Sequence, residues 1–233
     1  MAEEIEMEAN DIWVVVPAYN EADVIQASLS EVLKHFKNIV VIDDYSSDQT
    51  AKVALTAGAH VCRHPVNMGQ GAALQTGIDY ALSKGASAIV TFDADGQHRA
   101  EDAEKMVERL QTAKLDLVLG SRFKGAAAIG MPTAKAFFLK CATAYTRFTS
   151  GLDITDTHNG LRVMSRSAAE KIRIRQNRMA HASEILNQIA QFNLRYEEFP
   201  CVVRYSDYSR RKGQRMLGAI EILFDLYLRR LYK

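Results

Sequence analysis

Two periodicities of hydrophobic residues divide the first half of the chain into alternating segments. Short apolar runs rich in β-branched residues end at polar or turn-forming positions, as "IWVVVP" and "SAIVTF" do. Between these runs, apolar residues recur at the spacing of one helix face, as at Leu74, Ile78, Ala81 and Leu82. The pattern predicts strands over residues 12–17, 38–43, 60–64, 87–92 and 115–120, and helices over 23–36, 74–82 and 101–110.

This alternation predicts an α/β fold. Strands separated by helices of about ten to fifteen residues are typical of βαβ units, which build a mostly parallel sheet. The apolar runs are continuous, as expected of strands that are covered on both faces. We therefore predict a Rossmann-like, mostly parallel sheet with helices on both faces.

The pattern changes after residue 125. Residues 131–151 and 181–192 have the pattern of helices, and residues 157–165 and 195–205 that of a loop with a short strand and of a strand. A final amphipathic helix is predicted from Arg215 to Leu231, with a broad apolar arc. Because no repeat or linker interrupts the chain, we predict one domain over residues 1–214 and an amphipathic helix over 215–233.

Two of these helices carry apolar or aromatic residues that raise the question of what covers them, because such an arc can be broader than one packed face needs. They are the final helix and the helix over 131–151, which contains Phe137, Phe138, Tyr145 and Phe148. Such a face lies in a membrane interface, docks on the helices of a small membrane-protein partner, or packs on the protein's own core. The sequence leaves all three alternatives open.

Composition narrows the class of protein. The chain has 233 residues, of which 48% are hydrophobic and 24% charged. This is the composition of a soluble globular protein with enough apolar material for a sizeable hydrophobic core. A net charge of +1 predicts no nucleic-acid partner. Three widely spaced cysteines without a CxxC pair argue against a disulfide framework or zinc site. With an acidic start and no run of about 18 apolar residues, we expect a cytoplasmic protein.

Polar segments follow each predicted strand of the first half. In open α/β sheets, ligands bind outside the carboxyl ends of the strands, so these segments should meet on one rim. Each of them is polar, and several are rich in carboxylates, amides or glycine. They are "AYNEAD" (18–23), "DYSSDQ" (44–49), "PVNMGQG" (65–71), "DADGQH" (93–98) and "SRFKG" (121–125).

The segment "DADGQH" is the candidate metal site. Side chains alternate along an extended segment, so Asp93, Asp95 and Gln97 should face the same way. Three such oxygen-bearing side chains suit a hard cation, Mg²⁺ or Mn²⁺, with substrate phosphates as further ligands. The alternative is that Asp95 and Gln97 belong to the turn before the next helix.

Two other segments are candidates for donor binding. Asp43 and Asp44 end the second strand, where an acidic residue can accept hydrogen bonds from a nucleotide, although either could simply start a turn. The segment with Asn67 and Gly69 opens a helix, where free amides can receive an anion. It lacks the GxGxxG and GxxxxGK[ST] motifs, so the sequence supports neither a dinucleotide-binding nor a P-loop assignment.

Together these segments resemble glycosyltransferase family 2. "VVVPAYNEADVI", "VIDDYSSDQT", "HPVNMGQGAAL", "VTFDADGQH" and "LGSRF" match it in order and spacing over roughly residues 12 to 215. "DTHNGLRVMS" is similar to a segment of the polyprenyl-phosphate branch that ends in Gly-Phe-Arg, with Leu161 replacing phenylalanine. That branch contains the dolichyl-phosphate mannosyltransferase and bactoprenol glucosyltransferase types. The resemblance implies a GT-A fold that binds a nucleotide-sugar and a divalent metal.

Position by position, the resemblance implies roles for individual residues. Asp93, Asp95 and Gln97 would hold the metal against the donor diphosphate, and Arg122 would contact phosphate. Two departures stand out: the branch's Arg-x-x-Gly-x-Ser-Lys loop is replaced by "RYSDYSRRKGQ" (204–214), and the membrane-spanning helices of many relatives are missing. The residues that would line the nucleoside pocket are Pro17, Tyr19, Glu21 and Asp44.

An anionic acceptor needs cations of its own. We expect the catalytic contacts from Asp95, Arg122 and Arg162, since guanidinium groups bind phosphate through forked donors. Glu184 is a candidate for positioning a sugar hydroxyl, or a surface glutamate. The acceptor-phosphate candidates in the loop after the last predicted strand are Arg204, Arg210, Arg211 and Lys212, whose alternative role is that of a solvated basic loop.

The sequence thus predicts a metal-dependent inverting glycosyltransferase. It would move a sugar from a UDP- or GDP-sugar to a polyprenyl phosphate at the cytosolic face of a membrane. One alternative is a transferase of the same fold with a glycan or another soluble acceptor. The other is a non-catalytic nucleotide-binding scaffold that recruits a membrane partner through its last helix.

Overall fold

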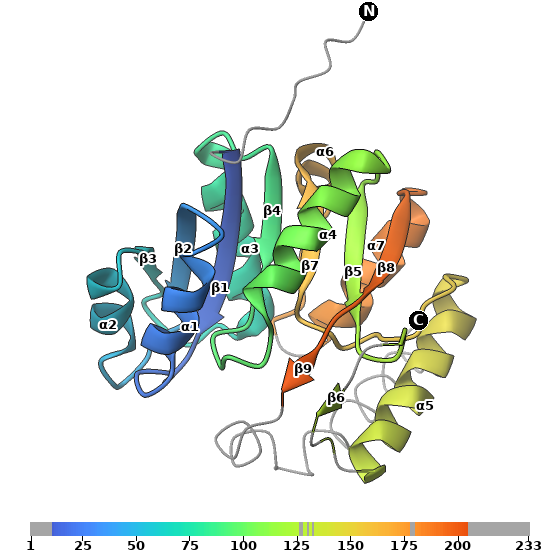
Figure 1. Ribbon diagram of the computed structural model, residues 1–233, viewed down its shortest axis with the longest axis horizontal. Helices are drawn as coiled ribbons and strands as arrows, with labels where there is room; N and C mark the ends of the chain where they lie inside the picture. The colour runs from blue at the N-terminus through green and yellow to red at the C-terminus, as the bar shows by residue number, and fades with distance from the viewer. Residues whose placement is uncertain (1–10, 126–127, 130, 132, 178–179, 205–233) are drawn as a thin grey trace, which may run out of the picture.

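A central sheet of buried strands organises the protein. The computed structural model describes residues 11–125, 128–129, 131, 133–177 and 180–204, so the helix expected over 215–231 lies outside the described residues. In the first half, the parallel strands β1 (Ile12–Ala18), β2 (Asn38–Asp43), β3 (His60–Arg63) and β4 (Ala88–Thr91) lie in the order β3-β2-β1-β4. Their positions confirm the predicted strands (Figure 1).

The second half completes the sheet with a reversed strand. β7 (Arg162–Ser165) lies antiparallel between β4 and β5 (Leu117–Ser121), and β8 (Tyr196–Pro200) is parallel to β5 at the edge. The seven-stranded order is β3-β2-β1-β4-β7-β5-β8. A second small sheet pairs β6 (Ala128–Ile129) with β9 (Val203–Arg204). The prediction of a mostly parallel sheet is therefore confirmed.

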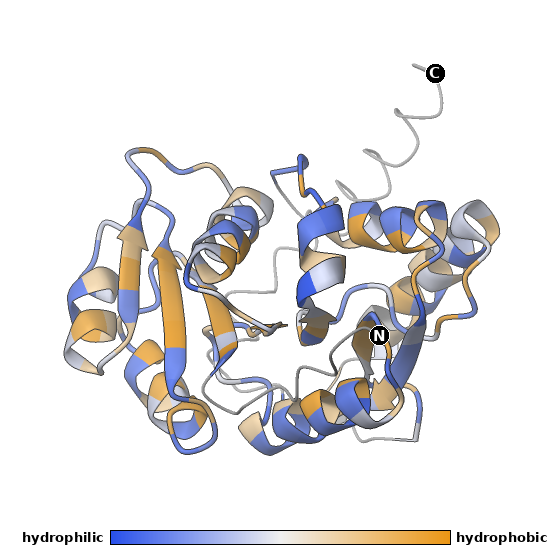
Figure 2. Cartoon of the chain, turned by 90° about the horizontal axis from the view of Figure 1, so that it is seen from above, coloured by the Kyte–Doolittle hydropathy of each residue, from blue (hydrophilic) through white to orange (hydrophobic). Residues whose placement is uncertain are grey.

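Helices cover both faces of the sheet and bury its alternating side chains (Figure 2). On one face, α1 (Ile25–Val32), α2 (Thr50–Thr56) and α4 (Ala100–Thr112) pack over one apolar cluster. On the other, α3 (Gln70–Ser83), α6 (Arg166–Lys171) and α7 (His181–Gln191) pack over a second cluster. α5 (Thr133–Ser150) lies beside α7, at the far end from β3 (Figure 1).

Local pairings explain where the elements differ from their predicted bounds. α2, α6 and β6 were not predicted, and α1 is shorter than the helix expected over 23–36. The strand expected over 195–205 is split, because Cys201 N–H donates to the Ser121 carbonyl and Val202 N–H donates to the Asp102 carboxylate. This break turns the chain from the edge of the main sheet toward β6. None of the described helices is both long and apolar enough to cross a membrane.

Candidate active site

A cavity of about 390 Å³ lies at the carboxyl ends of β1, β2 and β4. One wall consists of residues that directly follow these strands. The opposite wall consists of residues 158–162, which lead into β7, and of the first turn of α7. The predicted site residues that line this cavity are Pro17, Tyr19, Glu21, Asp44, Asp93, Asp95 and Arg162.

Asp93 belongs to the wall that follows the strands, and its carboxylate lies next to Gly160 of the other wall. Its carboxylate accepts hydrogen bonds from Gln70 Nε2 and from His98 Nε2, both at 3.2 Å. Burial opposes its ionisation, but the hydrogen bond from His98 and the charges of His98, Arg162 and His181 lower the pKa of Asp93 below its usual value. Asp93 is therefore a carboxylate that its surroundings keep ionised.

Asp95 has the opposite character. Burial and the nearby charge of Asp93 raise the pKa of Asp95 to about 6. Gln97 donates to it twice, from its backbone N–H to Oδ1 at 3.1 Å and from its side-chain amide to Oδ2. The Gln97 amide thus faces Asp95 and is not part of the cavity lining, so its role as a metal ligand stays a prediction. The following helix has Arg99 as its N-cap, with no side-chain cap, so Asp95 does not cap that helix.

The loop with Asn67 and Gly69 binds a carboxylate of the protein itself. Asp44 accepts hydrogen bonds from Met68 N–H at 2.8 Å, from His64 Nδ1 at 2.8 Å and from Gly69 N–H at 2.7 Å. Asn67 Nδ2 donates to the backbone carbonyl of Asp44 at 3.1 Å. The amides predicted to receive an anion are therefore satisfied by Asp44, and the loop supports the cavity from behind.

Asp43 also acts behind the cavity. It is fully buried, pairs with Arg63 Nε at 3.1 Å and accepts the backbone N–H of Ser46 at 3.0 Å. It does not line the cavity, whereas its neighbour Asp44 does. The geometry therefore favours Asp44 as the residue in reach of a nucleotide, and a direct contact from Asp43 stays a prediction.

Arg162 supplies a buried cation to the second wall. It opens β7, where its backbone is paired in register with Thr91 of β4 and Leu119 of β5. Its Nη1 has no hydrogen-bond partner among the described residues, although the side chain is buried and lines the cavity. Burial lowers the pKa of Arg162. A buried donor without a partner is costly, so this group is suited to an anion that enters the cavity.

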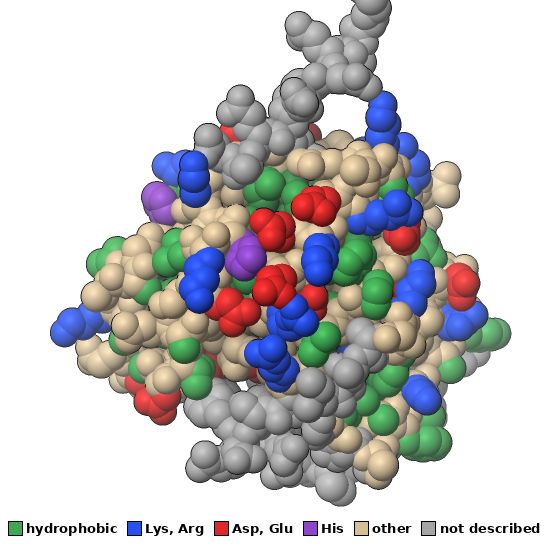
Figure 3. Space-filling model, viewed as in Figure 1, with side chains coloured by type: hydrophobic (Ala, Val, Ile, Leu, Met, Phe, Trp, Pro, Cys, Tyr) green, Lys and Arg blue, Asp and Glu red, His purple; other side chains and the backbone are tan. Residues whose placement is uncertain are grey.

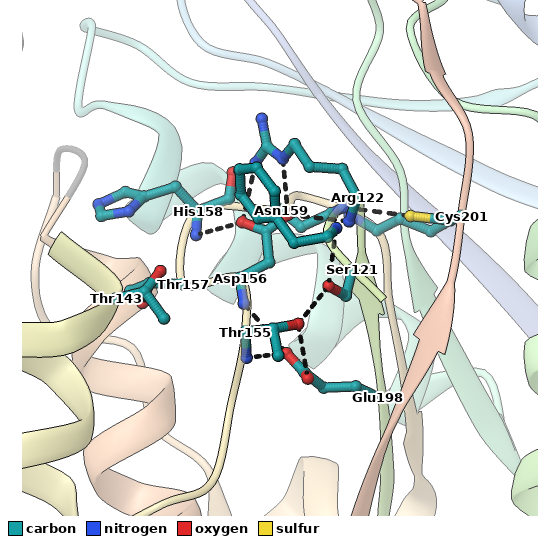
Figure 4. A network of polar contacts seen from close by, with 12 residues as sticks. Ser121, Arg122, Thr143, Thr155, Asp156, Thr157, His158, Asn159, Glu198 and Cys201 are labelled. Carbon is teal, nitrogen blue, oxygen red and sulfur yellow. Dashed lines mark hydrogen bonds and ion pairs between the residues drawn. The ribbon is translucent and has the colours of Figure 1, made fainter. Parts of the chain in front are cut away.

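Arg122 follows β5 but is committed to a buried ion pair (Figure 4). Its Nε and Nη2 donate to Asp156 at 2.6 and 3.1 Å, and Nη2 also donates to the His158 carbonyl oxygen at 2.7 Å. The Glu198 carboxylate accepts the backbone N–H groups of Thr155 and Asp156 at 2.7 and 3.1 Å. This network fixes the loop that leads to Arg162. A direct phosphate contact from Arg122 stays a prediction.

Three residues of the second wall were not predicted. His158 and His181 line the cavity, and a Cβ built on Gly160 would lie 2.1 Å from Asp93 Oδ2, so a larger residue there would displace that carboxylate or the loop. Burial, aided by the charges of Arg162 and Arg122, lowers the pKa of His158 to about 4. A histidine at the first position of the helix expected over 181–192 was the available signal for His181, and the glycine of the Gly-Leu-Arg segment in "DTHNGLRVMS" was the signal for Gly160.

The acceptor candidates lie apart from this cavity or outside the described residues. Arg204 is exposed on β9 and its backbone N–H donates to the Gln97 carbonyl oxygen at 2.9 Å, but it is not a lining residue. Arg210, Arg211 and Lys212 lie outside the described residues. The Glu184 carboxylate accepts the backbone N–H groups of residues 175 and 176 through Oε2, so it holds a loop, and its contact with a sugar hydroxyl stays a prediction.

Fold and cavity define an α/β glycosyltransferase of the GT-A type. The chain matches the model of glycosyl transferase family 2 over residues 13–173, and it belongs to that family. A solved structure of glucosyl-3-phosphoglycerate synthase from Mycobacterium tuberculosis superposes with a TM-score of 0.67 at 17% identity, over 91% of this chain and 78% of that one. At that identity the likeness shows the fold.

Three relatives extend the similarity. An uncharacterised protein of Methanocaldococcus jannaschii is 36% identical over 97% of this chain and 95% of the relative. A UDP-N-acetylglucosamine–dolichyl-phosphate N-acetylglucosaminyltransferase of Methanococcus voltae is 29% identical over 95% and 97%. A polyprenol monophosphomannose synthase of Mycolicibacterium smegmatis is 32% identical over 68% of this chain and 63% of the relative. These matches confirm the resemblance predicted from the sequence.

Proposed function

We propose that this glycosyltransferase moves a sugar, with inversion, from a UDP- or GDP-sugar to a polyprenyl phosphate at the cytosolic face of a membrane. The observation that carries the proposal is that two acidic side chains and a buried cation line the same cavity. Asp93 and Asp95 form an acidic wall, and the unpartnered Nη1 of Arg162 lies in the other. A donor diphosphate with its cation and an anionic acceptor require such a pair of walls.

The acidic wall fits a divalent cation. Burial and the charge of Asp93 raise the pKa of Asp95, and a bound cation would relieve this repulsion. Within the part of the chain that the structure describes, no three His, Cys, Asp or Glu side chains gather into a complete metal site. We infer that Asp93 and Asp95 hold Mg²⁺ or Mn²⁺ together with diphosphate and water oxygens, the ligands that such ions prefer. The cation would supply Lewis-acid neutralisation of the leaving diphosphate.

The chemistry needs positioning more than proton transfer. An acceptor phosphate oxygen attacks the anomeric carbon, the bond from that carbon to the diphosphate breaks, and the nucleoside diphosphate leaves with the electron pair. Because a phosphate monoester is already ionised at neutral pH, no strong general base is required. Arg162 donates to a phosphate oxygen, and its buried position makes that contact strong. Asp44 and Glu21 lie in reach of the nucleoside.

The names of the relatives support this choice of substrates. The Methanococcus relative is named for UDP-N-acetylglucosamine and dolichyl phosphate, and other relatives are named for polyprenol and undecaprenyl-phosphate products. Structures of glucosyl-3-phosphoglycerate synthase hold Mn²⁺ and UDP in the same fold, but with a soluble acceptor. The lipid-phosphate acceptor is therefore favoured by the more similar proteins.

A donor and acceptor panel tests the proposal. The purified protein is titrated with UDP- and GDP-sugars in Mg²⁺, Mn²⁺ or a chelator, and any donor that binds is then tested for transfer to a short polyprenyl phosphate in detergent. We expect binding of one donor that is lost in chelator, and transfer to the lipid phosphate. Transfer only to sugar alcohols or phosphoglycerate would establish a soluble acceptor. Donor binding without any turnover would favour the scaffold alternative.

A further inference from the structure

The outward face of α5 carries large aromatic rings, whereas its most buried side chains are small or polar. The buried side chains of its described part include Ala142, Thr143 and Thr146, which are small or polar. The exposed positions recur at the spacing of one helix face, which here carries Phe137 at 65% exposure and Phe148 at 82%. Its other exposed members are Thr133, Lys140, Cys141, Ala144 and Arg147.

Another long helix of the same protein shows the ordinary arrangement. α4 buries Ala103, Met106 and Leu110. Its exposed positions are charged, and Figure 3 shows mixed acidic and basic side chains over the centre of that face, with hydrophobic side chains at the lower right, where α5 lies. The pattern of α5 therefore differs from that of α4. The exposed positions of α4 include Glu101, Glu104, Lys105, Glu108 and Arg109.

The second property of α5 is its positive charge. Residues 133–150 include lysine and arginine but no aspartate or glutamate. Lys140 lies over the Phe123 ring, and Arg147 pairs with the exposed Asp153 at 2.8 Å. Beside this face, a groove of about 1160 Å³ lies between α5 and α7, and its lining includes Phe148, Phe192, three basic side chains (Lys171, Arg173 and Arg175) and the acidic Glu184.

We propose that the outward face of α5 docks on an anionic lipid bilayer. Exposed aromatic rings flanked by cations, with no anions, are the features of helices that lie in the headgroup region. The rings enter the interface while lysine and arginine contact lipid phosphates. A soluble protein partner would also cover aromatic rings, but a helix that contributes lysine and arginine and no acidic residue of its own is complementary to a surface of uniform negative charge. The exposed Asp153 carboxylate offsets the charge of Arg147 and leaves that of Lys140.

The docked helix would also bring the lipid surface close to the active site. Thr143 on the buried face of α5 accepts a hydrogen bond through Oγ1 from the Thr157 hydroxyl at 3.3 Å (Figure 4). Thr157 belongs to the loop held by Arg122 and Asp156, which continues into the cationic wall of the cavity. The inference rests on the proposed function, since a lipid-phosphate acceptor gives the enzyme a reason to lie on a bilayer.

Vesicle binding tests the surface directly. The full chain and a variant with Phe137→Ser and Phe148→Ser are sedimented with vesicles of equal parts phosphatidylcholine and phosphatidylglycerol, and with phosphatidylcholine alone. The matched control is Leu55→Ser, which removes a hydrophobic side chain of 65% exposure from α2. We expect the wild type and the control to bind anionic vesicles. The double variant should bind at least about tenfold more weakly, because it lacks the two aromatic rings that would enter the bilayer.

Two outcomes would overturn the inference. One is vesicle binding of the double variant equal to that of the wild type, and the other is a wild type that ignores vesicles but self-associates or binds a protein through these rings. The melting temperature and donor affinity of the variant verify its fold.

Transfer to a short polyprenyl phosphate in detergent separates the two proposals. The double variant should keep that activity, and its absence in the wild type contradicts the proposed function without deciding vesicle binding.

Discussion

The two walls of the cavity are built in different ways. The acidic wall, with Asp44, Asp93 and Asp95, consists of residues that directly follow parallel strands, so each is placed by its own strand. The cationic wall depends on contacts between distant segments. Arg162 is placed by an antiparallel strand paired on both sides, and His181 by a helix that packs on the opposite face from α4. The acidic wall is therefore local in origin, and the cationic wall is a product of the complete fold.

The largest expected effect comes from the acidic wall. We expect Asp95→Asn to lower transfer about a thousandfold and to abolish metal-dependent donor binding, because the amide is a poor ligand for a hard cation. The pKa of Asp95 is raised from 3.8 to about 6, so its ionised form destabilises the folded protein at pH 7. Without metal, the variant should therefore melt at the same or a higher temperature.

A matched control for this variant is Glu108→Gln, which neutralises an exposed carboxylate on α4. It should leave transfer, metal dependence and melting temperature unchanged. Turnover of Asp95→Asn at the wild-type rate would contradict the assignment of the acidic wall. Scanning calorimetry with and without Mn²⁺ measures the stability, and a donor-consumption assay measures the rate.

The cationic wall should give the next largest effect. We expect Arg162→Ala to lower kcat/KM about a hundredfold, since it removes the donor that faces the cavity without a partner. The loss of its charge should also raise the pKa of Asp93, which Arg162 helps to lower. Arg195→Ala, on an exposed arginine that pairs with Asp116, is the control. A loss of activity in Arg195→Ala equal to that in Arg162→Ala would show that Arg162 contributes only to the net charge of the protein and makes no specific contact in the cavity.

Gly160→Ala tests the contact between the walls. A Cβ at this position would lie 2.1 Å from Asp93 Oδ2, so either the carboxylate or the loop must move. We expect transfer to fall about tenfold, because a displacement of this size disturbs a catalytic group. Donor affinity in Mn²⁺ should fall with it, as isothermal titration can show. Unchanged affinity and rate would mean that Asp93 does not need its observed position.

The smallest effect concerns pH. The lowered pKa of His158, about 4 against an ordinary 6.5, means that the folded protein binds fewer protons than the unfolded chain between these values. Stability from this group is therefore lost as the pH falls from 6.5 toward 4. His158→Gln should flatten the decline of the unfolding free energy in that window, measured by urea denaturation relative to pH 7. An unchanged slope would contradict the burial of a neutral imidazole.

The contrast between the walls also explains what the sequence could predict. Asp93 and Asp95 were placed correctly because an apolar strand and its polar end are adjacent in the chain. Arg122 follows its strand in the same way, but its guanidinium binds Asp156, 34 residues later, and local pattern carries no signal for that pairing. The direction of β7 likewise depends on two neighbouring strands and not on its own residues.

The loop with Gly69 shows the same limit of prediction from local sequence. The segment with Gly69 has the composition of an anion-binding loop, and its amides do bind an anion, but that anion is the Asp44 carboxylate. The composition of the loop predicted that it binds an anion, but not that this anion is a side chain of the same protein. The three-dimensional arrangement was needed to show that the protein fills this site from its own chain.

That internal ligand has a kinetic consequence. A loop whose amides already surround a carboxylate is ordered before any nucleotide arrives, so donor association does not have to wait for it to fold. The entropy of ordering the loop is lost once, when the protein folds, and not in every catalytic cycle. Because Asp44 is held at both oxygens, the part of the cavity that we propose for the donor is ordered in advance.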